Sequence, residues 1–142
     1  MMSEHKHSIL ILKNEKGKYL QYFEERWNSY LFPNCKLVND DHKQIIINTL
    51  KDKFKLNLNG VKIEYIMDKI HTKFSESAKI EKVYHHFFYL IDCGSMPDYM
   101  KEKSFVNNDI KFTWFNIDEM EKDKRIMETN SDVVGFVKEI IF

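Results

Sequence analysis

One amphipathic helical segment lies between two groups of β-rich segments, and this order constrains the fold more than any other feature of the sequence. Residues 41–55 carry apolar side chains at helical spacing, which places on one face Ile46, Ile47, Leu50 and Phe54. Residues 61–74 and 80–91 are long β-rich runs joined by residues 75–79, a pattern that predicts a long hairpin. Because an apolar helix face must be buried against another element, this order predicts an α/β protein.

Shorter segments with strand patterns precede the helical segment. Residues 8–12 form an apolar run that predicts a buried strand, and residues 18–24 alternate well enough to return as a second strand. The turn residues 14–17 lie between them, so we expect the two strands to form a hairpin. Residues 28–32 predict a short extended piece that stops at the turn dipeptide at 33–34.

The segments after the long hairpin are less regular. Residues 96–108 are polar and predict a loop, with room for one helical turn. Residues 110–117 predict a strand, and residues 118–121 predict a short helix. Asn130 or Ser131 is expected to cap a final helix. Its predicted apolar face contains Val133, Val137, Ile140 and Ile141.

Composition and charge limit the classes of function. The chain has no internal repeat or linker, so we expect one domain over residues 1–142 with a mixed sheet between helices. Its 22 basic and 22 acidic residues balance, which leaves little counterion-release energy for binding bulk nucleic acid. The two cysteines, the lack of a signal-peptide pattern and the lack of an apolar run of ~20 residues predict a cytoplasmic protein without a membrane partner.

The residues that begin the helix have two interpretations. Asp41, followed three residues later by Gln44, has the pattern of a capping box. Asp40 and Asp41 are therefore interpreted first as helix caps, and second as metal ligands. The metal interpretation would need further acidic residues close by.

Arg26 and Trp27, followed by Leu-Phe-Pro and then by Asn34 and Cys35, form a pattern that resembles the start of the catalytic region of the Nudix hydrolases. Members of this family commonly have an Arg and a Trp, then Leu-Pro-Gly-Gly leading into a conserved motif, the Nudix box. Here Arg26 and Trp27 are followed by Leu-Phe-Pro, and Asn34 and Cys35 stand in place of the glycine pair. The late segment at residues 112–119 is also similar to the family. The resemblance implies a Nudix-type α/β/α sandwich with a mixed β-sheet.

The apolar positions set the register of the helix against the Nudix box. With Leu50 and Leu56 on apolar positions of the box, Thr49 and Lys53 stand where the family has the first and last helix Glu. Asp52 stands at the Glu between them. In the same register, residue 55, a Lys, replaces the closing Gly of the box, and residue 40, an Asp, takes the position of its isolated Glu.

These substitutions change what the helix can bind. In an active member, the helix glutamates hold Mg²⁺, which neutralises a pyrophosphate and activates water. Thr49 supplies no carboxylate, and a Lys53 ammonium about 4 Å from a cation would repel it by roughly 4 kcal/mol at an effective dielectric of 20. The same ammonium can bind phosphate instead of the metal. We therefore expect no cofactor, and Mg²⁺ only if the protein is active.

The resemblance implies four ligand-binding residues, Arg26, Trp27, Lys53 and Thr49. Each also has a simpler interpretation. Arg26 follows two acidic residues and can pair with them, and Trp27 can pack on the sheet. The two helix residues can belong to a solvated flank. The sequence leaves both interpretations open.

Three hypotheses for function follow from the resemblance. The first is a degenerate Nudix domain that binds a nucleotide or nucleotide-derived phosphate ligand, similar to the Nudix-like sensors associated with bacterial SMODS-type nucleotide synthetases. The second is an active pyrophosphatase with Mg²⁺ held by Asp52, Asp40 and Asp41, with Glu119 as a further acid. The third is a protein-interaction module. Edge strands and the apolar residues 140–142 also suggest a homodimer.

The histidines add one further expectation. His85 and His86 are adjacent in a strand, so their side chains point to opposite faces and cannot easily bind the same metal. His71 lies on the facing strand of the predicted hairpin. One His pair across the hairpin is therefore possible.

Overall fold

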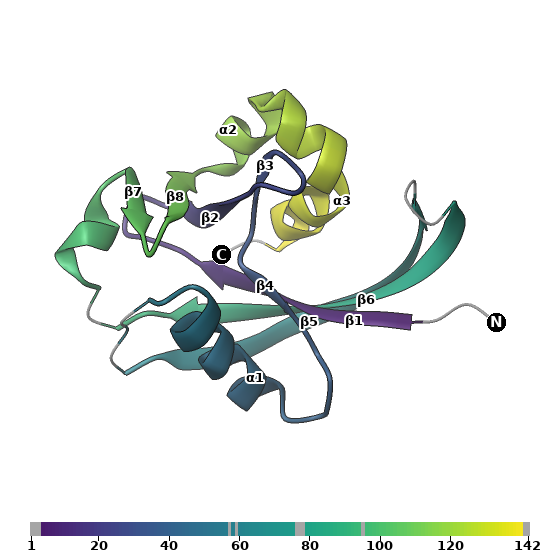
Figure 1. Cartoon of the computed structure of the whole chain (residues 1–142), viewed down its shortest axis with the longest axis horizontal. Coiled ribbons are helices and arrows are strands. Elements are labelled where there is room, and N and C mark those ends of the chain that lie inside the picture. Colours follow the sequence, from purple (N-terminus) through teal and green to yellow (C-terminus); the bar gives the residue numbers. More distant parts are fainter. Residues whose placement is uncertain (1–3, 57, 59, 76–78, 95, 141–142) are drawn as a thin grey trace.

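The computed structural model describes residues 4–56, 58, 60–75, 79–94 and 96–140. Within them, two four-stranded sheets form the centre of the molecule (Figure 1). The first contains, in spatial order, β4 (Asn34–Lys36), β1 (Glu4–Leu12), β6 (Ile80–Asp92) and β5 (Lys62–Ser75). The second contains β3 (Ser29–Leu31), β2 (Tyr19–Glu24), β8 (Ile110–Phe115) and β7 (Ser104–Asn107). The first sheet is mixed because β1 is parallel to β6 and antiparallel to β4.

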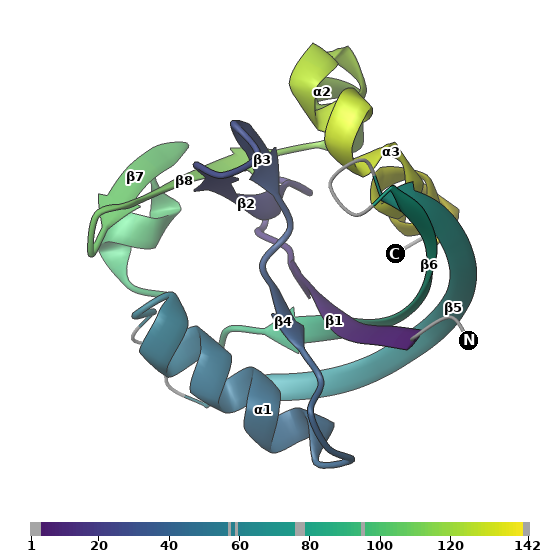
Figure 2. The same ribbon diagram turned by 45° about the vertical axis from the view of Figure 1, so that its right-hand side comes forward.

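Helices cover the strands on two opposite sides. On one side, α1 (His42–Asn48) continues into the π-helix η1 (Thr49–Lys53). On the other lie α2 (Ile117–Lys122) and α3 (Lys124–Glu139), and Figures 1 and 2 show the strands between these two groups. A 3-10 helix, η2 (Asp98–Lys101), precedes β7. This arrangement confirms the predicted α/β/α sandwich with a mixed sheet.

The strand β1 is buried on both faces, which explains its continuous apolar run. Leu10 and Leu12 pack with Leu50 of η1 in one apolar cluster. Ile9 and Ile11 pack in a second cluster with buried valines of α3. Successive side chains of a strand point to opposite faces, so β1 contributes to both clusters in turn.

The predicted helix is present and begins as expected. The Asp41 side chain accepts a hydrogen bond from the Gln44 backbone N–H at 3.3 Å. Of the predicted apolar face, Ile46, Leu50 and Phe54 are buried. Ile47 was wrongly placed there, because it is 43% exposed. Each helical residue turns the chain by about 100°, so Ile47, next to the fully buried Ile46, points away from the core.

The predicted N-terminal hairpin is wrong. An isolated bridge between Lys13 and Tyr19 joins β1 and β2, which then diverge into different sheets. The turn itself forms as expected, because the Asn14 side chain accepts hydrogen bonds from the N–H groups of Lys16 and Lys18. The strands separate because β1 pairs with β4 and β6, whereas β2 pairs with β3 and β8.

Two strands were missed. The dipeptide Pro33-Asn34 does not stop the chain, since β4 begins at Asn34 and pairs with β1. Pro33 has no N–H to donate, but its carbonyl accepts from the Leu10 N–H at 2.8 Å. In the predicted loop at 96–108, η2 is the expected helical turn, but β7 was not expected. Positive φ angles of 51° at Asn108 and 66° at Asp109 form the tight turn between β7 and β8.

The final helix begins earlier than predicted. The N-cap of α3 is Asp123, whose side chain accepts from the Ile126 N–H at 3.0 Å. Asn130, an expected cap, lies inside α3 at a kink, with φ −140° and ψ 21°. Asn130 was thus correctly identified as a point where the helical backbone is interrupted, although the helix begins before it. Val133 and Val137 are buried as expected. Residue 141 lies outside the described residues.

No helix in the described ranges is both long and apolar enough to cross a membrane. The homodimer stays a prediction. The edge strand β5 carries three exposed apolar side chains that such an interface could use, Tyr65, Ile70 and Phe74.

Candidate functional site

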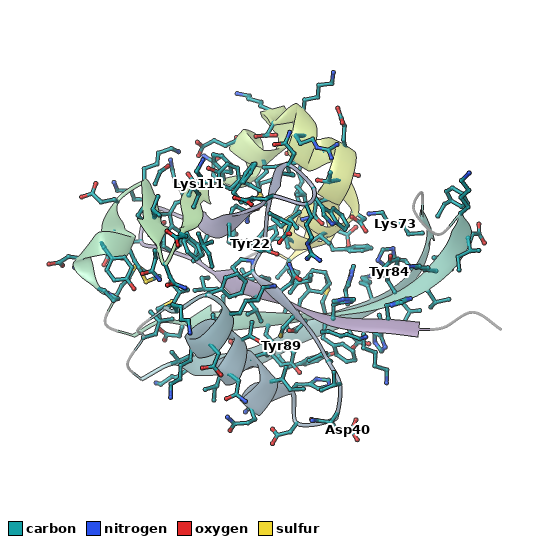
Figure 3. All side chains as sticks on the ribbon, viewed as in Figure 1. Tyr22, Asp40, Lys73, Tyr84, Tyr89 and Lys111 are labelled. Atoms are coloured by element: carbon teal, nitrogen blue, oxygen red, sulfur yellow. The ribbon has the colours of Figure 1, made fainter. Side chains whose placement is uncertain are left out.

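A cleft of about 680 Å³ lies between the β5–β6 hairpin, the strands β1 and β2, the end of η1 and the side of α3. Figure 3 labels three residues that line it, Tyr22 of β2, Lys73 of β5 and Tyr84 of β6. Segments far apart in the sequence therefore contribute to one site. A cleft of this size is in the usual range for a small-molecule ligand.

The structure brings together three of the predicted ligand-binding residues. Arg26, Trp27 and Lys53 all line the cleft. Thr49 is not among the lining residues, and its hydroxyl donates a hydrogen bond to the Ile45 carbonyl at 2.8 Å. A hydroxyl used in this way inside a helix is not oriented towards a ligand in the cleft.

Lys53 lies at the end of the widened helical turn η1. Its Nζ is 5.4 Å from the centroid of the Tyr22 ring and 5.1 Å from that of Phe54, which are cation–π distances. Lys53 is exposed to solvent, yet desolvation by its neighbours lowers the pKa of its ammonium, and the nearby Glu24 carboxylate partly opposes this effect. A bound anion would raise that pKa again, because a neighbouring negative charge favours the protonated form.

The backbone after Lys53 supports the register with the Nudix box. Lys55 stands where the box has its closing Gly, and its φ is 53°, in the left-handed region that favours glycine. The Asn107 side chain donates hydrogen bonds to the carbonyls of Phe54 and Lys55, which stabilises this helix end. The chain thus keeps the conformation that glycine would adopt.

Arg26 pairs with an acidic neighbour, as its simpler interpretation predicted. Its Nε donates to Glu24 Oε1 at 2.7 Å. Burial would raise the pKa of Glu24, but the hydrogen bond and charge of Arg26 outweigh that effect, so this pKa lies below its usual value. Burial also raises the pKa of the adjacent Tyr22 to about 12. The Arg26 side chain is largely exposed, so it can still reach a ligand.

Trp27 is positioned by α3. Its backbone carbonyl accepts two hydrogen bonds from Arg125, at 2.9 Å from Nε and 2.6 Å from Nη2. The residue is 46% exposed, so part of its side chain is accessible from the cleft that it lines. An exposed aromatic face at the rim of a cleft can stack on a base.

The acidic candidates do not gather within the described part of the chain. Asp40, Asp41 and Asp52 are all exposed. Figure 3 shows Asp40 at the outer edge of the molecule, away from the labelled cleft residues. The Asp41 side chain serves as the helix N-cap. Magnesium needs several oxygen ligands in near-octahedral geometry at about 2.0–2.1 Å, so these residues do not fit it.

One group of potential metal ligands does form among the described residues. His71, His86 and Asp132 each offer one ligand atom, and these atoms lie within 4.8 Å of one another. His86 and Asp132 line the cleft. Burial, and then the charge of His71, lowers the pKa of His86 to about 4, and burial also lowers the pKa of His71.

The sequence indicated part of this group. The His pair across the hairpin is confirmed, with His71 Nε2 at 3.2 Å from His86 Nδ1. The two residues are diagonal neighbours on one face, since His71 pairs with Tyr84 in the strand register. Asp132 was missed, because its place depends on how α3 packs across the cleft.

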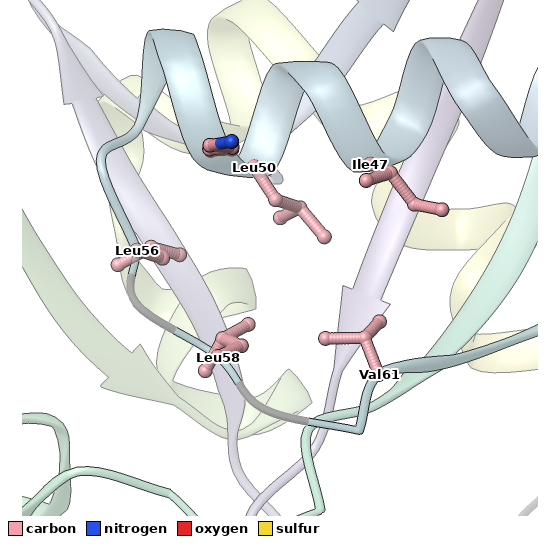
Figure 4. Close-up of a pocket in the computed structure, with 6 residues that line it drawn as sticks. Ile47, Leu50, Leu56, Leu58 and Val61 are labelled. Atoms are coloured by element: carbon pink, nitrogen blue, oxygen red, sulfur yellow. The ribbon is translucent and has the colours of Figure 1, made fainter.

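A second, smaller pocket of about 370 Å³ lies beside the helix (Figure 4). Its lining consists of the charged Lys51 and five apolar residues, Ile47, Leu50, Leu56, Leu58 and Val61. The exposed Ile47 forms part of this wall. Lys51 alone of these six residues can bind a phosphate ligand, whereas several basic side chains, Arg26 and Lys53 among them, line the larger cleft, so we assign the functional site to the larger cleft.

Several solved structures are similar to this chain over most of its length. The C. elegans Ap4A hydrolase has a TM-score of 0.58 and 11% identity, covering 99% of this chain and 100% of that one. A NUDIX-family hydrolase from Clostridium perfringens has a TM-score of 0.56 and 12% identity, covering 99% and 100%. A NUDIX hydrolase from Nitrosomonas europaea has a TM-score of 0.52 and 15% identity, covering 94% and 90%.

Sequence comparison gives no such link, since no protein-family model and no curated protein sequence matches the chain. The likeness is therefore one of three-dimensional structure, and at these identities it concerns the fold alone. It agrees with the resemblance at Arg26 and Trp27 and with the left-handed conformation of Lys55. The fold of this chain is that of the Nudix hydrolases.

Proposed function

We propose that this protein is a catalytically degenerate Nudix-fold domain that binds a nucleotide or nucleotide-derived phosphate ligand. The observation that carries the proposal is the position of Lys53, at the end of the Nudix-type helix and on the wall of the cleft. In the register of the Nudix box this position belongs to a metal-binding Glu. An ammonium there can neutralise phosphate charge without a metal.

The rest of the cleft suits the two parts of such a ligand. Besides Lys53, the basic residues that line it are Arg26, Lys73, Lys82 and Arg125. Charge-assisted hydrogen bonds from such groups to phosphate are stronger than neutral ones. The exposed ring of Trp27 offers a stacking surface for a base. The chain as a whole has no net charge. A local group of cations in a cleft therefore favours a small phosphate ligand over the long phosphate backbone of a nucleic acid, which a basic face would attract.

An active pyrophosphatase is the second candidate. It would need free acidic side chains beside the phosphate, whereas the acidic residues that line the cleft are paired with cations: Glu24 with Arg26 at 2.7 Å, Glu128 with Arg125 at 3.1 Å and Asp132 with Lys73 at 3.6 Å. The additional acid Glu119 is paired with Lys103 at 2.7 Å and with Lys18 at 3.2 Å. These carboxylates are engaged by cations, which favours binding over magnesium-dependent hydrolysis.

A thermal-shift screen tests the proposal against both alternatives. The protein is heated with nucleoside diphosphate and triphosphate derivatives, once with Mg²⁺ and once with a chelator. A ligand at 100 times its Kd stabilises the folded state by about 2.7 kcal/mol. We expect a raised melting temperature with the chelator present. A shift that requires Mg²⁺ would support the enzyme instead, and no shift with any nucleotide would support the protein-interaction module.

We further infer a sensor role in the bacterial cytoplasm, like that of the Nudix-like domains associated with SMODS-type synthetases. This inference rests on the resemblance of the sequence and on the replacement of the helix glutamates. A gene for a nucleotidyltransferase next to the gene for this chain would support it. A neighbourhood of unrelated metabolic genes would argue against it.

A further inference from the structure

Three elements bring two imidazoles and a carboxylate together on one wall of the cleft. His71 comes from β5, His86 from β6 and Asp132 from α3, two residues after the kink at Asn130. His71 Nε2 lies 3.2 Å from His86 Nδ1 and 3.6 Å from Asp132 Oδ2. The group thus spans the long hairpin and the helix on the facing layer.

These distances match those between ligands of one metal ion. In a tetrahedral zinc site with bonds of about 2.0–2.2 Å, neighbouring ligand atoms lie about 3.3–3.6 Å apart. The two separations measured from His71 Nε2 are close to these values. Small rotations about side-chain bonds would therefore suffice to place the three atoms around one ion.

The ligand types select the class of metal. Magnesium and calcium prefer oxygen ligands, whereas imidazole suits zinc, copper, iron and nickel. Three protein ligands with an open fourth position are typical of accessible zinc sites. Because His86 and Asp132 also line the cleft, the open position would face it.

Two further atoms indicate that a binding partner belongs here. Within the described part of the chain, His7 Nδ1 and Asp132 Oδ1 are buried and have no hydrogen-bond partner. His7 pairs with His86 in the register of β1 and β6, and their ring centroids are 6.2 Å apart. Buried polar atoms nearly always have a hydrogen-bond partner, and Lys73 Nζ approaches Asp132 Oδ1 only to 3.6 Å, beyond hydrogen-bond distance. These two atoms therefore point to a group that binds them.

Lys73 is the competitor for this site. Its Nζ lies 3.6 Å from Asp132 Oδ1, at the edge of an ion pair, and donates a hydrogen bond to the Thr129 carbonyl at 3.3 Å. The side chain is 42% exposed, so it can move into solvent when a cation binds Asp132. Its positive charge should weaken metal binding. Removing that charge should therefore strengthen metal binding, whereas removing one of the three ligands should weaken it.

We propose that His71, His86 and Asp132 form a binding site for a divalent transition-metal ion, best suited to zinc, with water at the open position. The ion would link the β5–β6 hairpin to α3 beside the cleft. The proposal is independent of the nucleotide-binding function, because it concerns the metal alone. It is also distinct from magnesium binding by the Nudix-type helix on the opposite wall.

The test is calorimetric titration of the chelator-treated protein, without a histidine tag, with Zn²⁺ alone. We expect one equivalent to bind. The substitutions His71→Gln and Asp132→Asn should each weaken binding by at least tenfold, whereas Lys73→Gln should strengthen it. His85→Gln is the matched control, because His85 lies on the other face of β6 and contacts Asp68. Its affinity should equal that of the wild type.

Cobalt provides an independent readout. Bound to nitrogen and oxygen ligands in a four-coordinate site, Co²⁺ should give visible absorption bands in the wild type that Asp132→Asn weakens. Circular dichroism with chelator present checks that each variant is folded. No zinc binding, or equal affinity in the wild type, His71→Gln and Asp132→Asn, would overturn the proposal. Neither result would bear on the nucleotide screen, which contains no zinc.

Discussion

The two walls of the cleft differ in the chemistry they present. The helix wall, where Nudix hydrolases carry their catalytic glutamates, presents Lys53 over the rings of Tyr22 and Phe54. The opposite wall gathers His71, His86 and Asp132. Our two proposals accordingly assign an anion to the first wall and a transition-metal cation such as Zn²⁺ to the second. The difference teaches that a shared fold fixes where a site lies but not which chemistry occupies it.

The largest expected effect concerns what holds the helix wall in place. Leu50 is 3% exposed and lies in the apolar cluster under the helix. Leu50→Ala should lower the free energy of unfolding by roughly 2–5 kcal/mol, because it leaves a cavity in a packed core. Urea unfolding measures this. Ile47→Ala, at a position of the same helix that is 43% exposed, is the control and should cost clearly less, because it removes less buried apolar surface. Equal losses would mean that the helix packs differently.

The second prediction concerns catalysis at the helix wall. We expect no appreciable Mg²⁺-dependent hydrolysis of nucleoside diphosphate derivatives. In the proposed register Thr49 and Lys53 stand where the Nudix box has glutamates, and the Thr49 hydroxyl bonds to its own helix. Phosphate release measured with excess enzyme would detect slow turnover. A turnover rate in the usual enzyme range of ~1 to 1,000 per second on any such substrate would contradict the proposal that the helix wall binds phosphate without catalysing its hydrolysis.

The third prediction reverses the charge of the helix wall. Lys53→Glu should weaken binding of the first nucleotide that gives a thermal shift by at least roughly tenfold, equivalent to about 1.4 kcal/mol. It should not create an efficient enzyme, because Thr49 still supplies no carboxylate. Calorimetry compares it with Lys43→Glu, the same charge change at an exposed position of α1 that does not line the cleft.

If Lys53→Glu and the wild type bind with equal affinity, Lys53 is a solvated residue and the ligand must bind elsewhere. If Lys43→Glu weakens binding as much as Lys53→Glu does, the effect comes from overall charge. In that case the helix wall has no specific role.

How much the sequence predicted depended on whether the signal was local. The helix with its Asp41 cap and the long hairpin follow from patterns within a few residues, and both are present. The pairing of β1 with β6 across the whole sheet was missed, because the nearest strand in sequence was assumed to be the partner. The turn at Asn108 and Asp109 did carry a local signal for β7, in residues that tolerate positive φ.

The same distinction applies to the candidate site. Arg26, Trp27 and Lys53 were predicted through a family register, and the fold brings them to one cleft. The register could not say that the Thr49 hydroxyl would turn back to its own helix. Asp132 could not be predicted as a partner of His71, since their approach depends on how α3 packs against the β5–β6 hairpin, and the pattern within one helix carries no such information.

The smallest expected effect tests the register that defines the helix wall. Lys55 has a φ of 53° at the position where the Nudix box has glycine. A left-handed conformation costs a non-glycine residue roughly 1–2 kcal/mol, while glycine loses more backbone entropy on folding, by about 0.5–1 kcal/mol. Lys55→Gly should therefore stabilise the protein by up to about 1 kcal/mol, measured by urea unfolding. Lys51→Gly, within the helical turn of η1, should instead destabilise it by about 1 kcal/mol. Destabilisation by both substitutions would mean that Lys55 does not occupy the glycine position, and the assignment of Lys53 to a metal-binding Glu would lose its structural support.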